Sequence, residues 1–306
     1  MTVREWLARR SYRAEQFPLA RLRELRASAG ATVSVVLPAR EVAATIGPIL
    51  AALTPLRDAG VVDELVVVDA ASADGTADVA RAGGARVVQE SSLLPEHGPA
   101  RGKGDALWRS LAATDGDVVV FLDADTEDFD DRFLRGLLGP LLSEQRIAFV
   151  KGAFRRPFRL GATTVPDGGG RVTELVARPL LNLHVPQLAG FVQPLAGEFA
   201  ARRALLEQLS FPVGYGVEIA TLIDACRLAG LDALAQVDLG ERQNRHQSLR
   251  ALSAMAYAVM VAAERRTGRP ELEPEALLLP HDGAVEAKQV AVEERPPLAS
   301  LRQDAA

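Results

Sequence analysis

The amino-acid sequence predicts an α/β fold with a mostly parallel sheet that is covered by helices on both faces. Short runs of Val, Leu and Ile alternate with longer stretches of helical character in the first half of the chain. Each of the first three connecting stretches closes on glycine, as helix C-termini often do. Strands that are apolar on both faces are typical of a parallel sheet buried between helices.

The alternating runs define the expected elements of this half. Strands are expected at 32–39, 64–70, 85–90, 117–125 and 147–154. Helices are expected at 44–60, 74–84 and 102–116. This order predicts a Rossmann-like half over residues 31–155, with its ligands beyond the carboxyl ends of the strands.

The rest of the chain is less regular. Residues 1–30 form an Arg-rich helical arm whose apolar positions are expected to be shallowly buried. Residues 156–266 form a second half, with helices expected at 173–183, 214–230 and 251–263 and a strand at 233–240. Residues 267–306, rich in Pro and Glu, are expected to be a mobile or clasping arm.

Composition limits the possible partners. The net charge of −5 argues against binding to nucleic acid or an anionic membrane through a general basic field. The longest apolar run, residues 251–263, is too short to cross a bilayer, and the N-terminal segment has no apolar signal sequence. Cys226 is the single cysteine, which excludes an internal disulfide. We therefore expect a cytoplasmic protein with neither nucleic acid nor membrane as a partner.

Two carboxylates follow the apolar run Val118–Leu122. Asp123 and Asp125 are expected at the same sheet edge as Pro38 and Asp69, which also end predicted strands. Like charges at this place indicate a compensating cation, and Mg²⁺ takes carboxylate and phosphate oxygens together. An acidic surface loop is the alternative, because the whole segment DADTEDFDD is acidic.

Other uses of this segment fit less well. A calcium loop that starts at Asp123 requires Gly and Glu where the chain has Asp128 and Leu134. In the D-x-D-x-T motif of haloacid-dehalogenase-like phosphatases, Thr126 falls one place early, and three predicted strands precede a motif that normally opens its domain. A sugar-nucleotide pyrophosphorylase requires a Gly-rich turn after the first strand, which here reads LPAREVAAT. The phosphatase remains a competing hypothesis.

Three further residues are candidates for binding anions or a metal. Lys103, in GPARGKGDALW, lacks the spacing of a phosphate loop but opens a predicted helix, whose amides and Lys103 are able to face phosphate. Arg171 follows the glycines of DGGGRVTEL at another helix start and suits an anion site. His246 is the preferred second metal ligand among four histidines. The alternative for Lys103 is a solvated lysine on a loop, and that for His246 is a solvated histidine. The alternative for the segment around Arg171 is a flexible hairpin.

The segments VVLPARE, VVVDAASADGT, GKGDALWRSLAAT and VVFLDAD together resemble the nucleotide-binding half of a GT-A glycosyltransferase. GGGRVTELVARPLLN, QPLAGEFAARR, GYGVEIATLID and AQVDLGERQNRHQSL narrow the resemblance to the glucosyl-3-phosphoglycerate synthases of actinobacteria and their mannosyl relatives. This resemblance implies transfer of a hexose, with retention, from a nucleotide sugar to the hydroxyl of 3-phosphoglycerate, with Mg²⁺ or Mn²⁺. UDP-glucose is favoured as donor, and GDP-mannose is the alternative. A non-catalytic nucleotide-sugar sensor is a further alternative.

The resemblance also implies a role for individual residues. Nucleotide binding falls to Pro38, Ala39, Arg40, Glu41, Asp69, Ala70, Lys103, Asp123 and Ala124. The sugar is held by Leu195, Tyr215 and Glu218. The acceptor is held by Gly170, Arg171, Thr173, Arg242 and Asn244. The metal is held by Asp125 and His246, and catalysis depends on Asp125, Lys103 and Glu218. The apolar segment LLNLHVPQLAGFV is a candidate homodimer face.

The chain departs from the pattern of these relatives at two places. Leu-Asn-Glu-Glu is expected after the first Pro-Ala, where this chain reads Arg40-Glu41-Val42-Ala43. This difference leaves the choice between uridine and guanosine open. His-Arg-Asn is expected where this chain reads Asn244-Arg245-His246. Residues two apart on an extended chain face the same side, so His246 is still expected to reach the metal.

Overall fold

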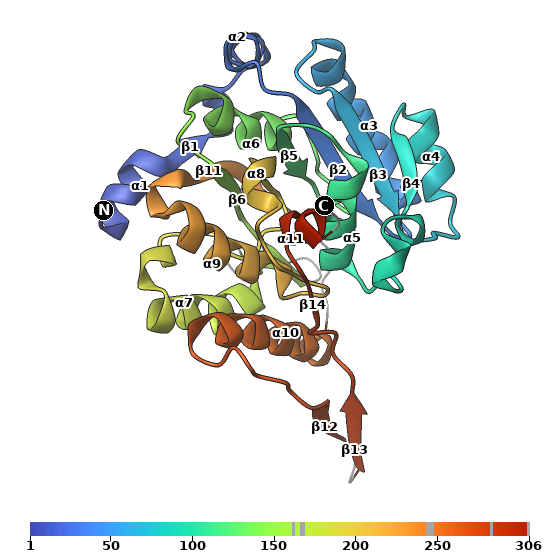
Figure 1. Cartoon of the computed structure of the whole chain (residues 1–306), viewed down its shortest axis with the longest axis vertical. Helices are drawn as coiled ribbons and strands as arrows, with labels where there is room; N and C mark the ends of the chain where they lie inside the picture. The colour runs from blue at the N-terminus through green and yellow to red at the C-terminus, as the bar shows by residue number, and fades with distance from the viewer. Residues whose placement is uncertain (161–162, 166–168, 243–247, 282–283, 305–306) are drawn as a thin grey trace.

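The computed structural model describes residues 1–160, 163–165, 169–242, 248–281 and 284–304. An eight-stranded sheet in the order β1-β11-β6-β9-β5-β2-β3-β4 forms its centre (Figure 1). In that order the strands are Ser11–Arg13, Leu234–Glu241, Phe149–Arg155, Phe199–Arg202, Val118–Phe121, Val33–Ala39, Glu64–Asp69 and Arg86–Gln89. β9 is antiparallel to both of its neighbours, and every other neighbouring pair is parallel. The prediction of a mostly parallel sheet is confirmed.

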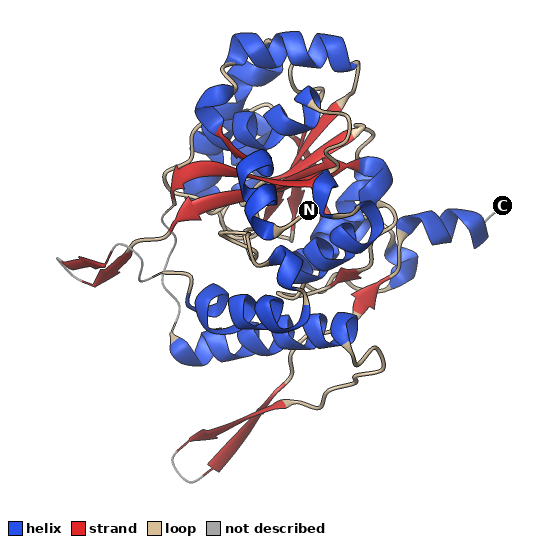
Figure 2. Ribbon diagram, turned by 90° about the vertical axis from the view of Figure 1, so that its left-hand side faces the viewer, coloured by secondary structure: helices blue, strands red, loops and turns tan. Residues whose placement is uncertain are grey.

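Helices cover both faces of this sheet (Figure 2). Successive side chains of β2 point to opposite faces of the sheet. Val36 belongs to one apolar cluster, and Val35 and Leu37 belong to the other. The cluster around Val35 contains residues of α3 (Ala43–Asp58) and α6 (Arg132–Ser143). The cluster around Val36 contains residues of α5 (Lys103–Ser110), α9 (Val217–Ala229) and α10 (Leu249–Thr267). α4 (Thr76–Ala82) connects β3 with β4.

Two predicted elements have different limits in the structure. The strand expected over 117–125 is β5, and it ends at Phe121. Asp123 and Asp125 therefore lie on the loop beyond the strand, where the backbone is free to turn them toward a ligand. The helix expected over 173–183 begins as a π-helical turn, Thr173–Ala177, and continues as α7, Arg178–His184.

The N-terminal segment lies deeper than the sequence suggested. α1 (Val3–Arg10), β1 and α2 (Leu19–Ala29) pack against the main body because β1 pairs with β11. Trp6 is fully buried, and its Nε1 donates to the backbone oxygen of Leu234 at 2.8 Å. Its ring lies 4.5 Å from that of Phe191, centroid to centroid. The expectation of shallow burial is therefore wrong, because this segment supplies an edge strand and a core tryptophan.

The C-terminal tail divides into a projecting hairpin and a clasp. β12 (Leu277–His281) and β13 (Ala284–Lys288) form a hairpin that leaves the body at the bottom of Figures 1 and 2. β14 (Glu294–Arg295) then returns to pair with β10 (Phe211–Pro212). Arg295 donates to both carboxylate oxygens of Asp105, at 2.9 and 2.7 Å. The tail thus clasps α5, whose first residue is Lys103.

Short elements complete the fold: β7 (Phe158–Leu160), β8 (Thr163–Val165), α8 (Arg203–Leu206) and α11 (Leu298–Asp304). The apolar run at 251–263 lies within α10, which packs on α9 and buries Ala258, Val259 and Ala262, as expected of a core helix. In the described ranges, no helix combines the length and the apolar character that a bilayer crossing requires.

Candidate active site

A cavity of about 1000 Å³ opens where the carboxyl ends of β2, β3 and β5 meet α5, α9, α10 and the tail. It brings together most of the residues that the sequence singled out. Those that line it are Pro38, Ala39, Arg40, Ala70, Lys103, Asp123, Ala124, Asp125, Gly170, Arg171, Thr173, Leu195, Tyr215, Glu218 and Arg242. Residues from opposite ends of the sequence therefore share one site, as strand ends in an open α/β sheet predict.

Four predicted site residues are not placed in the lining. Glu41 turns away, and its Oε1 accepts a hydrogen bond from the backbone N–H of Ala73 at 2.8 Å. Asp69 is buried behind the wall, where its carboxylate accepts from Gln89 Nε2 at 2.8 Å. Both carboxylates instead support the loops around the cavity. Asn244 and His246 lie outside the described residues.

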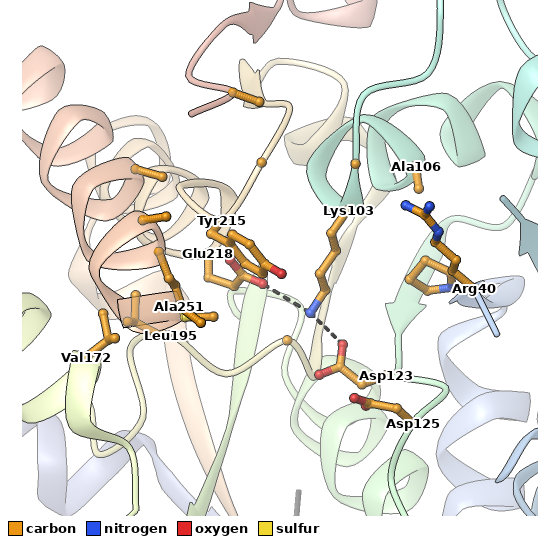
Figure 3. Close-up of a pocket in the computed structure, with 18 of the residues that line it drawn as sticks. Arg40, Lys103, Ala106, Asp123, Asp125, Val172, Leu195, Tyr215, Glu218 and Ala251 are labelled. Atoms are coloured by element: carbon orange, nitrogen blue, oxygen red, sulfur yellow. Dashed lines mark hydrogen bonds and ion pairs between the residues drawn. The ribbon is translucent and has the colours of Figure 1, made fainter. Parts of the chain in front are cut away.

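Lys103 occupies the centre of the cavity. Its ammonium lies 2.5 Å from Asp123 Oδ1 and 3.1 Å from Glu218 Oε1 (Figure 3). Burial disfavours the charged ammonium, but the two carboxylates outweigh burial and raise the pKa of Lys103 above its ordinary value. The lysine is therefore a fixed positive charge between the D-x-D segment and α9.

Gly197 makes the approach of these groups possible. A Cβ at this position would overlap Lys103 Nζ and both carboxylate oxygens of Asp123. The backbone just before β9 thus lies in direct contact with the Lys103–Asp123 pair. A side chain at residue 197 would displace the charged ends of this pair, which accounts for a glycine at this position.

Arg242 lies behind the two aspartates and is almost fully buried. Its Nη2 lies 2.9 Å from Asp123 Oδ2 and 3.3 Å from Asp125 Oδ1, and its Nη1 pairs with buried Glu198. Burial disfavours the charge on Asp123, but Lys103 and Arg242 outweigh it and lower the pKa of this carboxyl well below its usual range. Burial raises the pKa of Glu198. Arg242 therefore joins three carboxylates into one network.

The two aspartates differ in their availability to a metal. Asp123 already faces two cations, whereas the side chain of Asp125 is 63% exposed and meets Arg242 alone among the ion pairs of the described residues. Within the described part of the chain, no cluster of three His, Cys, Asp or Glu side chains forms a metal site. Magnesium-like ions need one or two protein carboxylates when phosphate oxygens complete the shell. Asp125 with Asp123 fits a divalent cation that is held jointly with a phosphorylated ligand.

The opposite wall offers cations and backbone groups for a second anion. Gly170 has a φ of +67°, and its carbonyl accepts from the N–H of Glu174, so the turn leads directly into the helix. The N–H of Gly169 donates to the backbone oxygen of Arg156 at 2.9 Å, and both Arg156 and Arg171 line the cavity. Sequence reasoning missed Arg156. A weak signal was present, because Arg156 stands two residues beyond the end of the predicted strand 147–154.

The chain contains three lysines among 35 basic residues, and all three belong to this region. Lys103 and Lys288 line the cavity, and Lys151 is fully buried on β6. Lys151 Nζ lies over the rings of Phe149 and Phe199, 5.8 and 5.2 Å from their centroids, and donates to the backbone oxygen of Glu218 at 3.4 Å. Burial lowers the pKa of Lys151 to about 8. Sequence reasoning missed this residue, since a lysine within an apolar run gives no signal of its depth.

The depressed pKa of Lys151 predicts a pH-dependent stability. In the unfolded chain a lysine titrates near its ordinary value, so between pH 8 and about 10.5 the unfolded state binds more protons than the folded state. The free energy of unfolding of the wild type, relative to Lys151→Met, should therefore rise over this interval by roughly 1–3 kcal/mol. Urea unfolding of both proteins at pH 7 and pH 10 measures it. A difference that stays constant with pH would show that Lys151 is solvated.

The first comparison with known proteins defines the class. Residues 34–166 match the family model described as Glycosyl transferase family 2. The match runs from β2 to the end of β8 and includes Lys103, Asp123 and Asp125. The chain is a glycosyltransferase with a GT-A fold.

Relatives that match nearly the whole chain define the family. A glucosyl-3-phosphoglycerate synthase of Mycolicibacterium smegmatis is 43% identical over 97% of this chain and 98% of that protein. A crystal structure of a mannosyl-3-phosphoglycerate synthase from Rubrobacter xylanophilus has a TM-score of 0.87 at 45% identity, over 97% of this chain and 99% of that chain. A glucosyl-3-phosphoglycerate synthase from Mycobacterium tuberculosis, crystallised with Mn²⁺, UDP-glucose and phosphoglyceric acid, has a TM-score of 0.83 at 45% identity, over 93% of this chain and 95% of that chain. This chain belongs to the glucosyl-3-phosphoglycerate synthase family.

Proposed function

We propose that this chain transfers glucose from UDP-glucose to the hydroxyl of 3-phosphoglycerate. The observation that carries the proposal is the charge pattern of this cavity, in which a D-x-D pair with Lys103 lies on one side and Gly170, Arg156 and Arg171 line the other. One side suits a metal-bound diphosphate, and the other suits a small acceptor with a phosphate and a carboxylate. The relative crystallised with Mn²⁺, UDP-glucose and phosphoglyceric acid supports this pairing.

In this proposal, residues 31–155 form a donor-binding half and residues 156–266 form a half that binds the sugar and the acceptor. Residues 1–30 and the tail 267–306 flank these two halves. Pro38, Ala39, Arg40 and Ala70 face the nucleoside, and Leu195, Tyr215 and Glu218 face the sugar. Asp125 holds Mg²⁺ or Mn²⁺, with His246 as a second ligand. Gly170, Arg171, Thr173 and Asn244 hold the acceptor, and Arg242 supports it from behind the aspartates.

In the proposed reaction the bond between the anomeric carbon and the diphosphate breaks while the acceptor oxygen attacks from the same face, so that configuration is retained. A divalent cation at Asp125 would neutralise charge that develops on the diphosphate. Lys103 stabilises the same charge from α5. The acceptor proton passes to the departing phosphate oxygen. Glu218 is held by Lys103 at 3.1 Å and binds the sugar rather than attacking it.

Incubation with 3-phosphoglycerate, Mg²⁺ and either UDP-glucose or GDP-mannose tests this function. We expect UDP release that depends on the acceptor, together with an α-linked product by NMR. Release of inorganic phosphate from 3-phosphoglycerate without nucleotide would favour the phosphatase. Donor binding without turnover would favour a sensor, and preference for GDP-mannose would favour the mannosyl alternative. A covalent sugar adduct on Glu218, found by mass spectrometry after the wild type is incubated with UDP-glucose alone, would contradict the proposed retaining step.

Replacing Arg171 by alanine tests the acceptor side. We expect the KM for 3-phosphoglycerate to rise about 10- to 100-fold, because a charge-assisted hydrogen bond to an anion is lost. The KM for UDP-glucose should change little, since the donor lies on the other side of Lys103. Steady-state kinetics with each substrate varied in turn gives both values. An equal rise in both KM values would move Arg171 out of the acceptor site.

We further propose that the enzyme is a cytoplasmic homodimer. The segment 180–192 supplies part of a candidate contact face, because Leu183 and Val192 are exposed while Leu181, Leu188 and Phe191 belong to the core. Light scattering on the wild type and on Leu183→Glu measures the oligomeric state. A monomeric wild type would contradict the proposal.

A further inference from the structure

Glu90 is a buried carboxyl group in the cavity wall that the proposed reaction does not use. It follows β4 and opens a 3₁₀ turn, Glu90–Ser92, that packs on α5. Glu90 is only 5% exposed, and its Oε1 is buried without a hydrogen-bond partner. A buried carboxyl oxygen without a partner is costly, and Glu90 lines the cavity, which makes its carboxyl group a candidate partner for a ligand bound there.

The position of Glu90 identifies which part of the donor it faces. In the sheet order β5-β2-β3-β4, the aspartates follow β5 and Glu90 follows β4. The aspartates and Glu90 therefore lie at opposite ends of this row of strand ends. Figure 3 shows Arg40 and Ala106 on this side of Lys103, opposite Val172 and Leu195. A diphosphate at Lys103 with its sugar toward Leu195 leaves the nucleoside on the side of Arg40. Glu90 therefore lies at the nucleoside end.

The groups that face Glu90 make its carboxyl easy to protonate. Asp105 and Arg109 face it from α5, and Arg40 faces it from the loop after β2. Burial and the negative charge of Asp105 outweigh the two arginines and raise the pKa of Glu90 to about 7. The neutral form, which offers one donor and one acceptor, is thus accessible near neutral pH.

We infer that Glu90 is a specificity-determining residue that binds the imide edge of uracil in the donor. This inference rests on the proposed function, because it takes the ligand to be a nucleoside diphosphate sugar. Uracil presents N3–H beside the O4 carbonyl, which complements the acceptor and donor of a neutral carboxyl group. Guanine presents N1–H beside a 2-amino group, two donors that require an ionised carboxylate. The protonated carboxyl therefore selects uridine over guanosine.

Glu90→Gln separates this role from a structural one. The amide keeps one donor and one acceptor at every pH and adds no volume. We expect the Kd of UDP to change little between pH 6 and pH 8.5 in this variant, whereas the wild type should weaken about tenfold over that interval. We also expect the preference for UDP over GDP at pH 8.5 to be about tenfold greater in Glu90→Gln than in the wild type. Glu90→Ala should bind UDP more weakly than the wild type at pH 6.

Calorimetric titration of UDP and GDP in the presence of Mn²⁺ measures these affinities. Glu96→Gln is the matched control, because Glu96 lies six residues away with a side chain 63% exposed, and its variant should keep the wild-type pH profile. Phosphate protonation contributes equally to every variant, so the ratio of the wild-type and Glu90→Gln affinities at each pH removes it. Equal base preference and equal pH profiles in wild type and Glu90→Gln would overturn the inference.

The two proposals fail in different ways. Unaltered base preference in Glu90→Gln together with UDP-glucose turnover would overturn the role of Glu90 and leave the proposed function standing. The expected shifts in UDP and GDP binding, without sugar transfer by the wild type, would support the role of Glu90 and overturn the transferase. Failure of the wild type to bind either nucleotide would overturn both.

Discussion

Replacing Lys103 by alanine is expected to lower kcat/KM for UDP-glucose by about 100- to 1000-fold, because the fixed positive charge that meets the diphosphate is lost. The loss should fall on the donor, since Lys103 bridges Asp123 and Glu218 on the donor side of the cavity. Its removal also leaves those carboxylates facing the incoming phosphates. Steady-state kinetics at saturating acceptor measures the effect.

Lys288→Ala provides the matched comparison, because Lys288 is the other lysine in the cavity lining but belongs to the tail rather than to α5. Lys288→Ala removes one positive charge from the cavity but leaves Lys103 in place. The comparison therefore distinguishes the specific position of the Lys103 charge from the total positive charge of the cavity. We expect a much smaller effect on kcat/KM than for Lys103→Ala. Equal losses in both variants would contradict a specific role for Lys103.

Replacing Arg242 by alanine is expected to lower the free energy of unfolding by about 3–5 kcal/mol, because it leaves buried carboxylates without their partner. Arg242 pairs with Asp123, Asp125 and Glu198, and Glu198 is as deeply buried as the arginine itself. Burial has already raised the pKa of Glu198, so this group will take up a proton when its partner is removed. Urea unfolding at pH 7 measures the loss.

Arg81→Ala is the control for this prediction. Arg81 pairs with Asp78 at 2.8 Å on the surface, with side chains 55% and 87% exposed. An exposed pair of this kind contributes at most about 1 kcal/mol. If Arg242→Ala cost no more than Arg81→Ala, the network behind the aspartates would not be a stabilising element of the fold.

The sequence predicted much of the fold because hydrophobic periodicity and helix-ending glycines are local signals. β2, β3 and β4 lie within a residue or two of the expected runs. Asp123 and Lys103 were found for the same reason, since charged residues at the end of an apolar strand or the start of a helix stand out in a short window. Their meeting at 2.5 Å follows from the chain order of α5 and β5, because α5 starts at the edge of the sheet where β5 ends.

The remaining parts of the site depend on contacts between distant segments. β9 enters antiparallel between β5 and β6, and no local pattern in the segment 199–202 specifies that position. Glu198, which precedes β9, is buried for this reason, although its charge predicts exposure. Glu90 and Lys151 are similar cases, because burial of an ionisable side chain is decided by what packs over it. Glu41 shows the opposite case, a conspicuous charged residue that accepts from the Ala73 N–H and does not line the cavity.

Binding of UDP-glucose to the wild type and to Asp125→Ala, each with Mn²⁺ and with EDTA, tests the central claim most directly. If a divalent cation joins Asp125 to the diphosphate, calorimetry should show that Mn²⁺ tightens binding to the wild type at least about tenfold and barely changes binding to the variant. Equal affinities in all four titrations would contradict it.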